Sequence, residues 1–380
     1  MNQITKKQLI GKPLFIIFGL ATLVGLICWF LQLTQGLQLT NLNNHSVWGL
    51  YIVGFVLFTG VAAGSLLFAS SAYLFKLMEE FKPYARIVSF VGAISSVVAA
   101  GLFIMVDIGN PGRAWYFITS ANISSPMFWD SIILLVYLVV GLWFTQQLIK
   151  AHEGQAGTKS IRTLSIIAFV AGLFVMVTSF VFAFQVARPF WNNPAQPVSF
   201  LAAAIAAALA LYILLFVALN KGGYIQISEA RLSRMAKVAA ICLIFELVVV
   251  LAEITIGLYA GTGGNAAIIN WLISGDGIIF FWLQVVLLVG GVVLLSGKNV
   301  KTLVIGAVAA LFGVFMVKYN LLQAQLVNPL ITYAGPPGYS GVGGAYLPSI
   351  IELGVAVGII AIAGLVVMVG LNSLNLGARS

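Results

Sequence analysis

Charged residues are scarce in this sequence: Asp, Glu, Lys and Arg together make up 8% of its 380 residues. A typical soluble domain carries about 25% charged residues, and the mean hydropathy of this chain is +1.07. This composition excludes an ordinary soluble domain and predicts an integral membrane protein.

Cysteine and histidine are also scarce, with two residues of each. Cys28 and Cys242 lie in separate apolar runs, whereas an iron–sulfur cluster needs about four thiolates. We therefore expect two inert buried thiols and no cluster in this chain. His45 and His152 are predicted to lie on opposite sides of the membrane, so they cannot form the axial pair of a transmembrane haem. Neither a zinc signature, a phosphate-binding loop nor a nucleophile elbow is present, so we expect no metal site and no complete redox enzyme or ATPase.

What the sequence does contain is apolar runs long enough to cross a bilayer. The ten runs cover residues 13–33, 47–75, 85–106, 128–149, 163–187, 198–219, 236–260, 276–297, 302–326 and 348–371. No cleavable signal sequence precedes the first run, which follows Lys6, Lys7 and Lys12 and is interpreted as a retained helix.

The positions of the basic residues predict the orientation. If the N-terminus is cytoplasmic, 16 of the 19 Lys and Arg residues fall on the cytoplasmic side, and Arg113, Arg188 and Lys318 fall on or toward the outside. This asymmetry follows the positive-inside rule, and it places both termini in the cytoplasm. It also accounts for the net charge of +9 without a nucleic-acid partner.

The long connections are predicted to be external, and they hold few lysines but many aromatic, Asn, Gly and Pro residues. They cover residues 34–46, 107–127, 188–197, 261–275 and 327–347. Such a face is typical either of a docking surface or site or of the aromatic belt at the lipid headgroups.

Ionisable residues at membrane depth are costly and usually functional. The candidates are Asp107, Asp130, Glu246, Glu253, Asp276, Lys318 and Glu352. Glu246 and Glu253 are seven residues apart, so they share one helix face at a distance of about 10 Å. The pair could hand protons from the deep membrane toward the outer edge, or Glu246 could simply be a neutral carboxyl group hydrogen-bonded within the bundle. Lys318 is expected to pair with Glu253 or Glu352, in a structural or a catalytic ion pair.

A repeated spacing suggests two similar bundles. Asp107 and Asp130 are 23 residues apart, as are Glu253 and Asp276, and an offset of 146 residues relates the two pairs. This offset superimposes the second to fifth helices on the sixth to ninth. The sequence thus predicts an all-α integral membrane protein with two four-helix bundles flanked by the first and tenth helices. The predicted units are an N-terminal helix in 1–40, a first bundle in 41–190, a second bundle in 191–335 and a C-terminal helix in 336–380.

The segment MVDIGNPGRAWYFITSANISSPMFWD, residues 105–130, concentrates polar groups at the outer edge of the first bundle. Asp107 ends the third helix and Asp130 begins the fourth, with Arg113 between them. His45 and Trp48 open the second helix on the same side, and Gln185 and Arg188 reach this level near the fifth.

A quinol requires this combination, because its tail needs an apolar cleft and its hydroxyl groups need hydrogen-bond and proton acceptors. Simpler roles remain open. Asp107 and Arg113 could form a salt bridge that fixes the loop, Asp130 could stabilise a helix N-terminus, and His45 could be an interface or capping residue.

Four segments resemble the polysulfide-reductase membrane subunits of the NrfD/PsrC family, and within it the ten-helix branch that includes HybB and DsrP. They are VWGLYI at 47–52, DIGNPGRAW at 107–115, SPMFWDSIILLVYL at 125–138 and SFVFAFQVARPFWNNP at 179–194; EITIGLY at 253–259 is a weaker match. Asn110 departs from the pattern, since the family commonly has a basic residue there.

The resemblance implies a membrane subunit, located in a bacterial or archaeal cytoplasmic membrane, that carries no haem and no iron–sulfur cluster. Such subunits bind menaquinol or ubiquinol at the periplasmic edge of the first bundle. They exchange electrons with a ferredoxin-like iron–sulfur subunit, which connects to a molybdopterin, hydrogenase or multihaem cytochrome subunit.

On the resemblance, Asp130 and His45 would be proton acceptors or hydrogen-bond partners of the quinol. Asp107 and Arg113 would shape the pocket, and Trp48 and Tyr116 would pack on the ring. Arg188 and Gln185 complete the expected quinone site, while Glu246, Glu253 and Lys318 form the expected proton path. Two other classes of function remain as alternatives, a secondary transporter and a purely structural membrane anchor.

Overall fold

The computed structural model describes residues 12–154, 158–174, 176–260, 264–328, 345–374 and 376. Within these residues the secondary structure is helical throughout, and ten helical spans are long and apolar enough to cross a membrane. The predicted all-α fold with ten spans is therefore confirmed. Lys6, Lys7 and Arg379, used to predict the orientation, lie outside the described residues, as does the boundary expected between 335 and 336.

Eight spans contain one helix each. These helices are α1 (Lys12–Gln35), α2 (Leu50–Leu74), α6 (Pro126–His152), α9 (Gln196–Lys221), α10 (Glu229–Ala260), α12 (Ile278–Leu295), α13 (Val300–Leu326) and α14 (Ile350–Ser373). Short helices in the connections are η1 (Leu37–Leu39), η4 (Pro111–Arg113), α5 (Tyr116–Thr119) and α11 (Gly264–Ile273).

The third span is segmented. It begins with the 3₁₀ helix η2 (Lys76–Tyr84) and continues through α3 (Ala85–Phe90), the π-helical turn η3 (Val91–Ser96) and α4 (Val97–Asp107). Gly92 lies in the π-helical turn, where a Cβ atom would overlap the side chain of Ser65 in α2. The turn therefore lies where the third span packs closely against α2, which fits the use of π-bulges at special positions in helices.

The fifth span consists of α7 (Thr158–Phe174) and α8 (Val177–Ala183). The sequence predicted this helix to continue to residue 187, but α8 ends at Ala183 and Gln185 and Arg188 lie in the turns that follow. The Phe184 N–H still bonds to the Phe180 carbonyl at 3.0 Å, and the chain leaves the helix after this residue.

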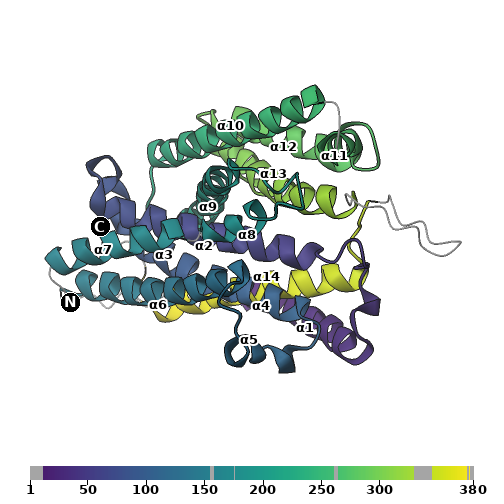
Figure 1. Cartoon of the computed structure of the whole chain (residues 1–380). Coiled ribbons are helices and arrows are strands. Elements are labelled where there is room, and N and C mark those ends of the chain that lie inside the picture. The colour runs from purple at the N-terminus through teal and green to yellow at the C-terminus, as the bar shows by residue number, and fades with distance from the viewer. Residues whose placement is uncertain are drawn as a thin grey trace, which may run out of the picture.

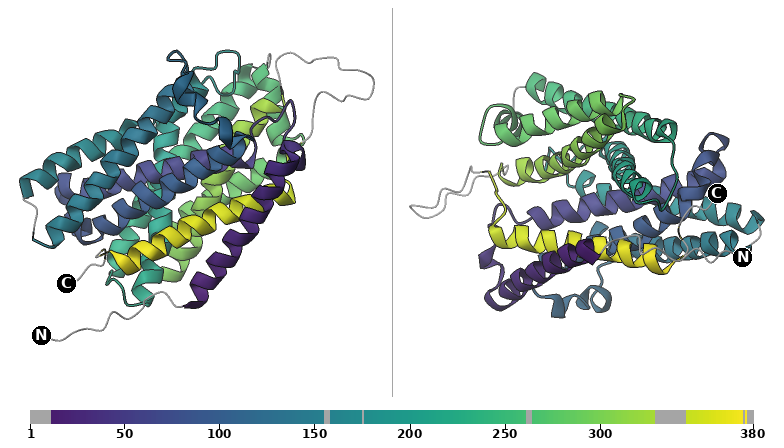
Figure 2. Two further views of the ribbon diagram at one scale, coloured as in Figure 1. Left: turned by 90° about the horizontal axis from the view of Figure 1, so that it is seen from below. Right: turned by 180° about the vertical axis from the view of Figure 1, so that it is seen from behind.

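The helices group as the sequence predicts. α2, the third span, α6 and α7 pack together, and so do α9, α10, α12 and α13, while α2 and α9 join the two groups. α1 packs along α14. Figure 1 shows α10, α12 and α13 on one side of the molecule, α1 and α14 on the other, and α2 and α9 between them. Figure 2 shows the α1–α14 pair side by side in two further views.

Small residues allow the helices to approach closely, as is usual in membranes. Gly25 of α1 faces Gly358 of α14, and a Cβ atom on either would overlap the backbone of the other. Gly64 of α2 faces Ala204 and Ala208 of the alanine-rich helix α9 in the same way. We call the contact between α2 and α9 the seam between the two bundles. At this seam the two backbones lie close together, and side chains from both helices pack against each other.

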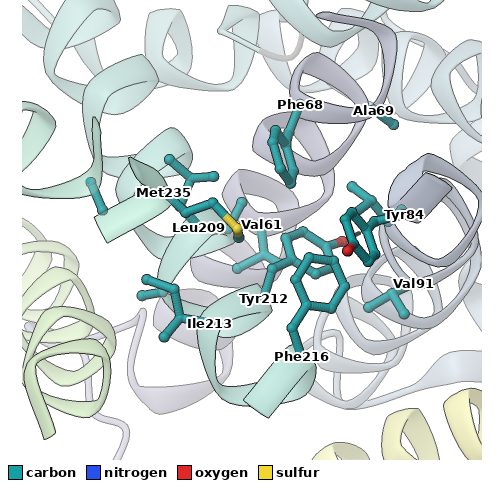
Figure 3. Packing of buried hydrophobic residues seen from close by; sticks show 14 of the residues in the cluster. Val61, Phe68, Ala69, Tyr84, Val91, Leu209, Tyr212, Ile213, Phe216 and Met235 are labelled. Carbon is teal, nitrogen blue, oxygen red and sulfur yellow. Dashed lines mark hydrogen bonds between the residues drawn. The ribbon is translucent and has the colours of Figure 1, made fainter. Parts of the chain in front are cut away.

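The core at this seam contains buried aromatic side chains whose hydroxyl groups have partners. Tyr212 of α9 donates to Ser65 Oγ of α2 at 2.6 Å and lies 3.0 Å from the Val88 carbonyl oxygen of α3. Figure 3 shows Tyr212 next to Phe216, with Tyr84 and Val91 from the third span close by. Since an unpaired hydroxyl is costly away from water, these bonds stabilise the joint between the bundles.

Candidate functional site

Asp130 is a buried carboxylate near the start of α6. Its side chain is 6% exposed, and Thr178 Oγ1 of α8 donates to Asp130 Oδ1 at 2.5 Å. Pro126 opens the helix, a position that suits proline because no helical N–H is lost there. Asp130 lies in the second turn, whereas stabilisation by the helix dipole is confined to the first turn. Its main contact is therefore the inter-helix bond to Thr178.

Asp107, at the end of α4, belongs to a different polar network. The preceding carbonyl of Val106 accepts from Gln32 Nε2 at 3.0 Å, and Tyr51 donates to Gln32 Oε1 at 2.6 Å. Asp107 interacts electrostatically with Glu352 of α14. Its Oδ1 atom is buried and has no hydrogen-bond partner among the described residues. The structure thus directs Asp107 toward α1, α2 and α14.

Glu352 anchors the ends of several segments at the same end of the bundle as Asp107. It accepts hydrogen bonds from the backbone N–H of Asn41 at 2.9 Å and of Ser349 at 2.8 Å, and from the Tyr346 hydroxyl. Burial, followed by the bond to Glu352, raises the pKa of Tyr346. The Tyr346 oxygen also accepts from the Leu50 N–H at the start of α2. Glu352 therefore fixes the start of α14 against the start of α2. Asp276, another candidate from the sequence, is exposed before α12.

Arg113, Trp115 and Tyr116 are exposed in the connection between α4 and α6. In the described part of the chain, Arg113 forms no ion pair with Asp107 or Asp130. The Trp115 and Tyr116 rings contact each other, with centroids 4.6 Å apart. The loop-fixing salt bridge considered from the sequence is thus not formed, and this segment presents an aromatic and basic surface.

Trp48 lies in an inter-bundle aromatic cluster made of Trp48, Phe182, Arg188 and Trp191. The Trp48 and Trp191 rings stack at 5.6 Å, Phe182 meets both edge-on, and the Arg188 guanidinium lies 4.8 Å from the Trp191 centroid. Burial lowers the pKa of Arg188, but an arginine stays charged at physiological pH.

Bonds to α13 hold this cluster across the seam. Gln323 Nε2 donates to the Trp48 carbonyl at 2.7 Å, and Trp191 Nε1 donates to the Leu321 carbonyl at 2.7 Å. The other expected members lie apart from it. Gln185 donates to Val181 within its own turn at 3.2 Å, and His45 lies in the turn before α2, its backbone N–H donating to Asn43 Oδ1 at 2.9 Å.

In the second bundle, Glu246 and Glu253 line one internal cavity of about 30 Å³. Glu246 is fully buried, and Ser199 Oγ lies 2.9 Å from both of its oxygens. Glu253 Oε1 accepts from Asn193 Nδ2 at 2.6 Å and Gln196 Nε2 at 3.1 Å. The two carboxylates therefore face the same space but have separate hydrogen-bond partners.

Lys318 of α13 carries a buried amino group, with 4% of the residue exposed. Its Nζ lies 3.6 Å from the centroid of the Phe200 ring and has no hydrogen-bond partner in the described ranges. Among the described residues it forms no ion pair with Glu253 or Glu352, although it interacts electrostatically with Glu246 and Glu253. The Glu352 oxygens already accept hydrogen bonds from the Asn41 and Ser349 backbone N–H groups and from the Tyr346 hydroxyl.

Lys318 also lines a second cavity of about 30 Å³, together with Thr59 and Thr178. The Thr59 hydroxyl is buried without a partner in the described part of the chain, and Thr178 donates to Asp130. Polar groups therefore extend from Asp130 through Thr178 and this cavity to Lys318, and from Glu246 through the other cavity to Glu253. Thr59, Thr178 and Ser199 were not predicted from the sequence, where their only signal is a hydroxyl inside an apolar helix.

Within the described residues, no group of three His, Cys, Asp or Glu side chains is arranged to hold a metal ion. The side chains described above offer proton acceptors, hydroxyl groups, an amino group and aromatic surfaces.

Comparison with known proteins places these features in a family. Residues 38–329 match the family model described as "Polysulphide reductase, NrfD". A putative membrane subunit of a dimethyl sulfoxide reductase from Halobacterium salinarum is 31% identical, and the alignment covers 97% of this chain and 92% of the relative.

Two further relatives are more distant. A selenate reductase subunit from Mesobacillus selenatarsenatis is 24% identical over 84% of both chains. An Hdr-like menaquinol oxidoreductase integral membrane subunit from Archaeoglobus fulgidus is 26% identical over 53% of this chain and 49% of the relative. With its ten spans, the chain is an integral, multi-pass membrane protein.

Proposed function

Because the chain belongs to the NrfD family of polysulfide-reductase membrane subunits, we propose that it is the quinone-reactive membrane subunit of a respiratory oxidoreductase. It exchanges electrons between the quinol pool and an iron–sulfur subunit on the periplasmic side of a bacterial or archaeal cytoplasmic membrane. The relative named as a menaquinol oxidoreductase subunit supports a quinol substrate, menaquinol or ubiquinol. The relatives named for dimethyl sulfoxide and selenate reductases support a reductase as the partner.

The finer assignment is to the ten-helix branch that includes HybB and DsrP, which agrees with the ten spans. In this proposal residues 41–190 bind the quinol and residues 191–335 carry protons. The ferredoxin-like partner connects in turn to a molybdopterin, hydrogenase or multihaem cytochrome subunit. The exposed surface of Arg113, Trp115 and Tyr116 suits the docking of that partner.

The observation that carries the proposal is the buried Asp130–Thr178 pair at the outer end of the first bundle. A carboxylate has about four lone-pair sites, and the Thr178 hydroxyl occupies one of them. Asp130 therefore retains acceptor capacity for a quinol hydroxyl. Oxidation of a quinol to the quinone releases two electrons and two protons, and Asp130 accepts one of these protons.

The other proposed roles fall to two groups of residues. Trp48 stacks on Trp191, and the Arg188 guanidinium brings a positive charge to the same cluster. Tyr116 and Arg113 lie at the exposed edge. His45 would receive the second proton from the entry to α2, and Asp107 would shape the side of the pocket next to α1.

Protons leave Asp130 through Thr178 and the cavity at Lys318, and continue through Glu246 and the second cavity to Glu253. Each cavity, at about 30 Å³, has room for roughly two water molecules and offers polar partners for them. Ordered water would satisfy the Thr59 hydroxyl and the Lys318 ammonium. This route gives the protein a means of coupling quinol oxidation to proton translocation.

The test replaces Asp130 with Asn, which keeps the shape and the Thr178 contact but removes the proton acceptor. In the purified complex we expect quinol oxidation to fall by about 100-fold or more, and binding of a fluorescent quinol-analogue inhibitor to weaken. Ser131→Ala is the matched control, since Ser131 is exposed one residue further along α6 and donates to the Met127 carbonyl within the helix.

Full turnover of an assembled Asp130→Asn complex would overturn the assignment and support a purely structural anchor. Ion-coupled solute uptake by vesicles that contain the chain alone would support a secondary transporter. The buried charges and cavities in the interior of the second bundle are the feature that favours this alternative.

A further inference from the structure

A third cavity, much larger than the two described above, lies on the seam between the bundles. Its volume is about 320 Å³, and its walls come from α2, η2, α7, α9 and α10. Sites that bind small molecules have volumes of about 300–1,000 Å³, so this cleft is large enough for a ligand. We call it the seam cleft.

The lining of the seam cleft is almost entirely apolar. Phe68, Leu209 and Met235 form part of its wall, and Figure 3 shows these three side chains in the packed region between the bundles. Phe75 and Val238 also line the cleft and are 49% and 37% exposed, so they lie where it opens to the outside of the helical bundle. In a chain whose outer helical surface faces lipid, such an opening admits hydrocarbon.

One end of the cleft is basic. Arg234 contributes to its lining, and the Arg234 side chain is half exposed although it pairs with Glu80 at 2.6 Å. Arg231 reaches the same carboxylate at 3.6 Å, so two guanidinium groups share one acid. The segments 76–82 and 229–237 at this end contain five basic and three acidic side chains, so an excess of positive charge remains. Basic groups next to a membrane attract anionic lipid headgroups.

We propose that the seam cleft binds an anionic phospholipid, with an acyl chain between the bundles and the headgroup at the Arg234 end. Charge complementarity and an apolar lining identify this occupant. A quinone ring fits less well, because it needs a hydrogen-bond partner at both ends. The polar side chains of the cleft are Ser71 and Arg234, and the Ser71 hydroxyl already donates to the Leu67 carbonyl at 2.6 Å.

The bound lipid would act as a wedge between the two bundles, since the cleft is lined by α2 and α7 of one bundle and by α9 and α10 of the other. The bound lipid would contact α2 and α9, the helices that join the two bundles. The proposal is independent of the quinol reaction, and it predicts that the stability of the protein depends on the charge of the lipid.

The experiment compares the full-length wild type with Val238→Trp, which fills the mouth of the cleft. The control is Ile241→Trp, because Ile241 is 65% exposed on the same helix but does not line the cleft. Each protein is exchanged extensively into detergent, the lipid that remains bound is identified by native mass spectrometry, and the melting temperature is measured with phosphatidylglycerol and with phosphatidylcholine.

We expect the wild type and Ile241→Trp to retain one anionic phospholipid and to be stabilised more by phosphatidylglycerol. Val238→Trp should lose both properties. Arg234→Gln should still retain lipid but should lose about fivefold of its preference for the anionic headgroup. Equal retention by both tryptophan variants, or a co-purifying quinone that is lost selectively from Val238→Trp, would overturn the proposal.

Discussion

Lys318 is a buried basic side chain at the cavity that it shares with Thr178. A buried charge without close partners costs free energy, and its replacement by an apolar residue of similar volume is often neutral or stabilising. Lys318 is buried, lacks a hydrogen-bond partner within the described residues, and lies at the cavity that leads to Asp130. This position suits the part in moving protons that we propose for Lys318.

We therefore predict that Lys318→Met leaves the melting temperature unchanged or raises it, while proton movement coupled to quinol oxidation falls by about 100-fold. The measurement uses a pH-sensitive dye in proteoliposomes that contain the assembled complex. Lys301→Met serves as the control, since Lys301 is exposed at the start of the same helix. Proton movement that survives in Lys318→Met would remove Lys318 from the route.

At the scale of elements, glycines determine which helices can meet. The α1–α14 pair depends on the contact between Gly25 and Gly358, where the two backbones approach more closely than any side chain would allow. Gly19 lies on the same helix α1, but a Cβ atom there would meet nothing within 4 Å. The two positions therefore separate the effect of helix contact from the effect of helix propensity.

Gly25→Val should separate α1 from α14 and lower the free energy of unfolding by about 1–3 kcal/mol, the usual cost of overpacking. Gly19→Val should change it far less. Unfolding in a denaturant series, followed by tryptophan fluorescence, measures both variants. A similar loss in the two variants would mean that the contact between the helices contributes little.

At the scale of the whole molecule, the orientation in the membrane decides which face can meet a periplasmic partner. The distribution of basic residues predicts that the segment around residue 124 is external and that the α9–α10 connection near Lys221 is cytoplasmic. Both Ser124 and Lys221 are exposed, so both can be labelled. Orientation follows from charge, because cytoplasmic loops retain Lys and Arg during insertion.

The prediction is that a single cysteine at position 124 reacts with a membrane-impermeant maleimide in right-side-out vesicles, whereas one at position 221 reacts only after the membrane is permeabilised. Cys28 and Cys242 are replaced by alanine in both proteins. Labelling of position 221 in intact vesicles would reverse the orientation and move the proposed partner to the cytoplasmic side.

The number and approximate limits of the membrane spans could be predicted from the sequence, because spanning depends on length and apolarity alone. The sequence also identified several ionisable residues that are buried, such as Asp130, Glu246 and Lys318. It could not show that Asp107 turns toward Glu352 or that Trp48 stacks on Trp191. Nor could it show that Thr178 links Asp130 to the cavity at Lys318.

The reason is physical. A helix that is apolar all around carries no amphipathic stripe to indicate which face meets which neighbour. In a membrane those faces are chosen by close contacts between small residues and by hydrogen bonds between helices. The contacts between Gly64 and Ala204 and between Gly25 and Gly358 join residues far apart in the chain. The spans were therefore encoded locally, whereas the site, its cavities and the seam cleft were fixed by contacts between distant segments.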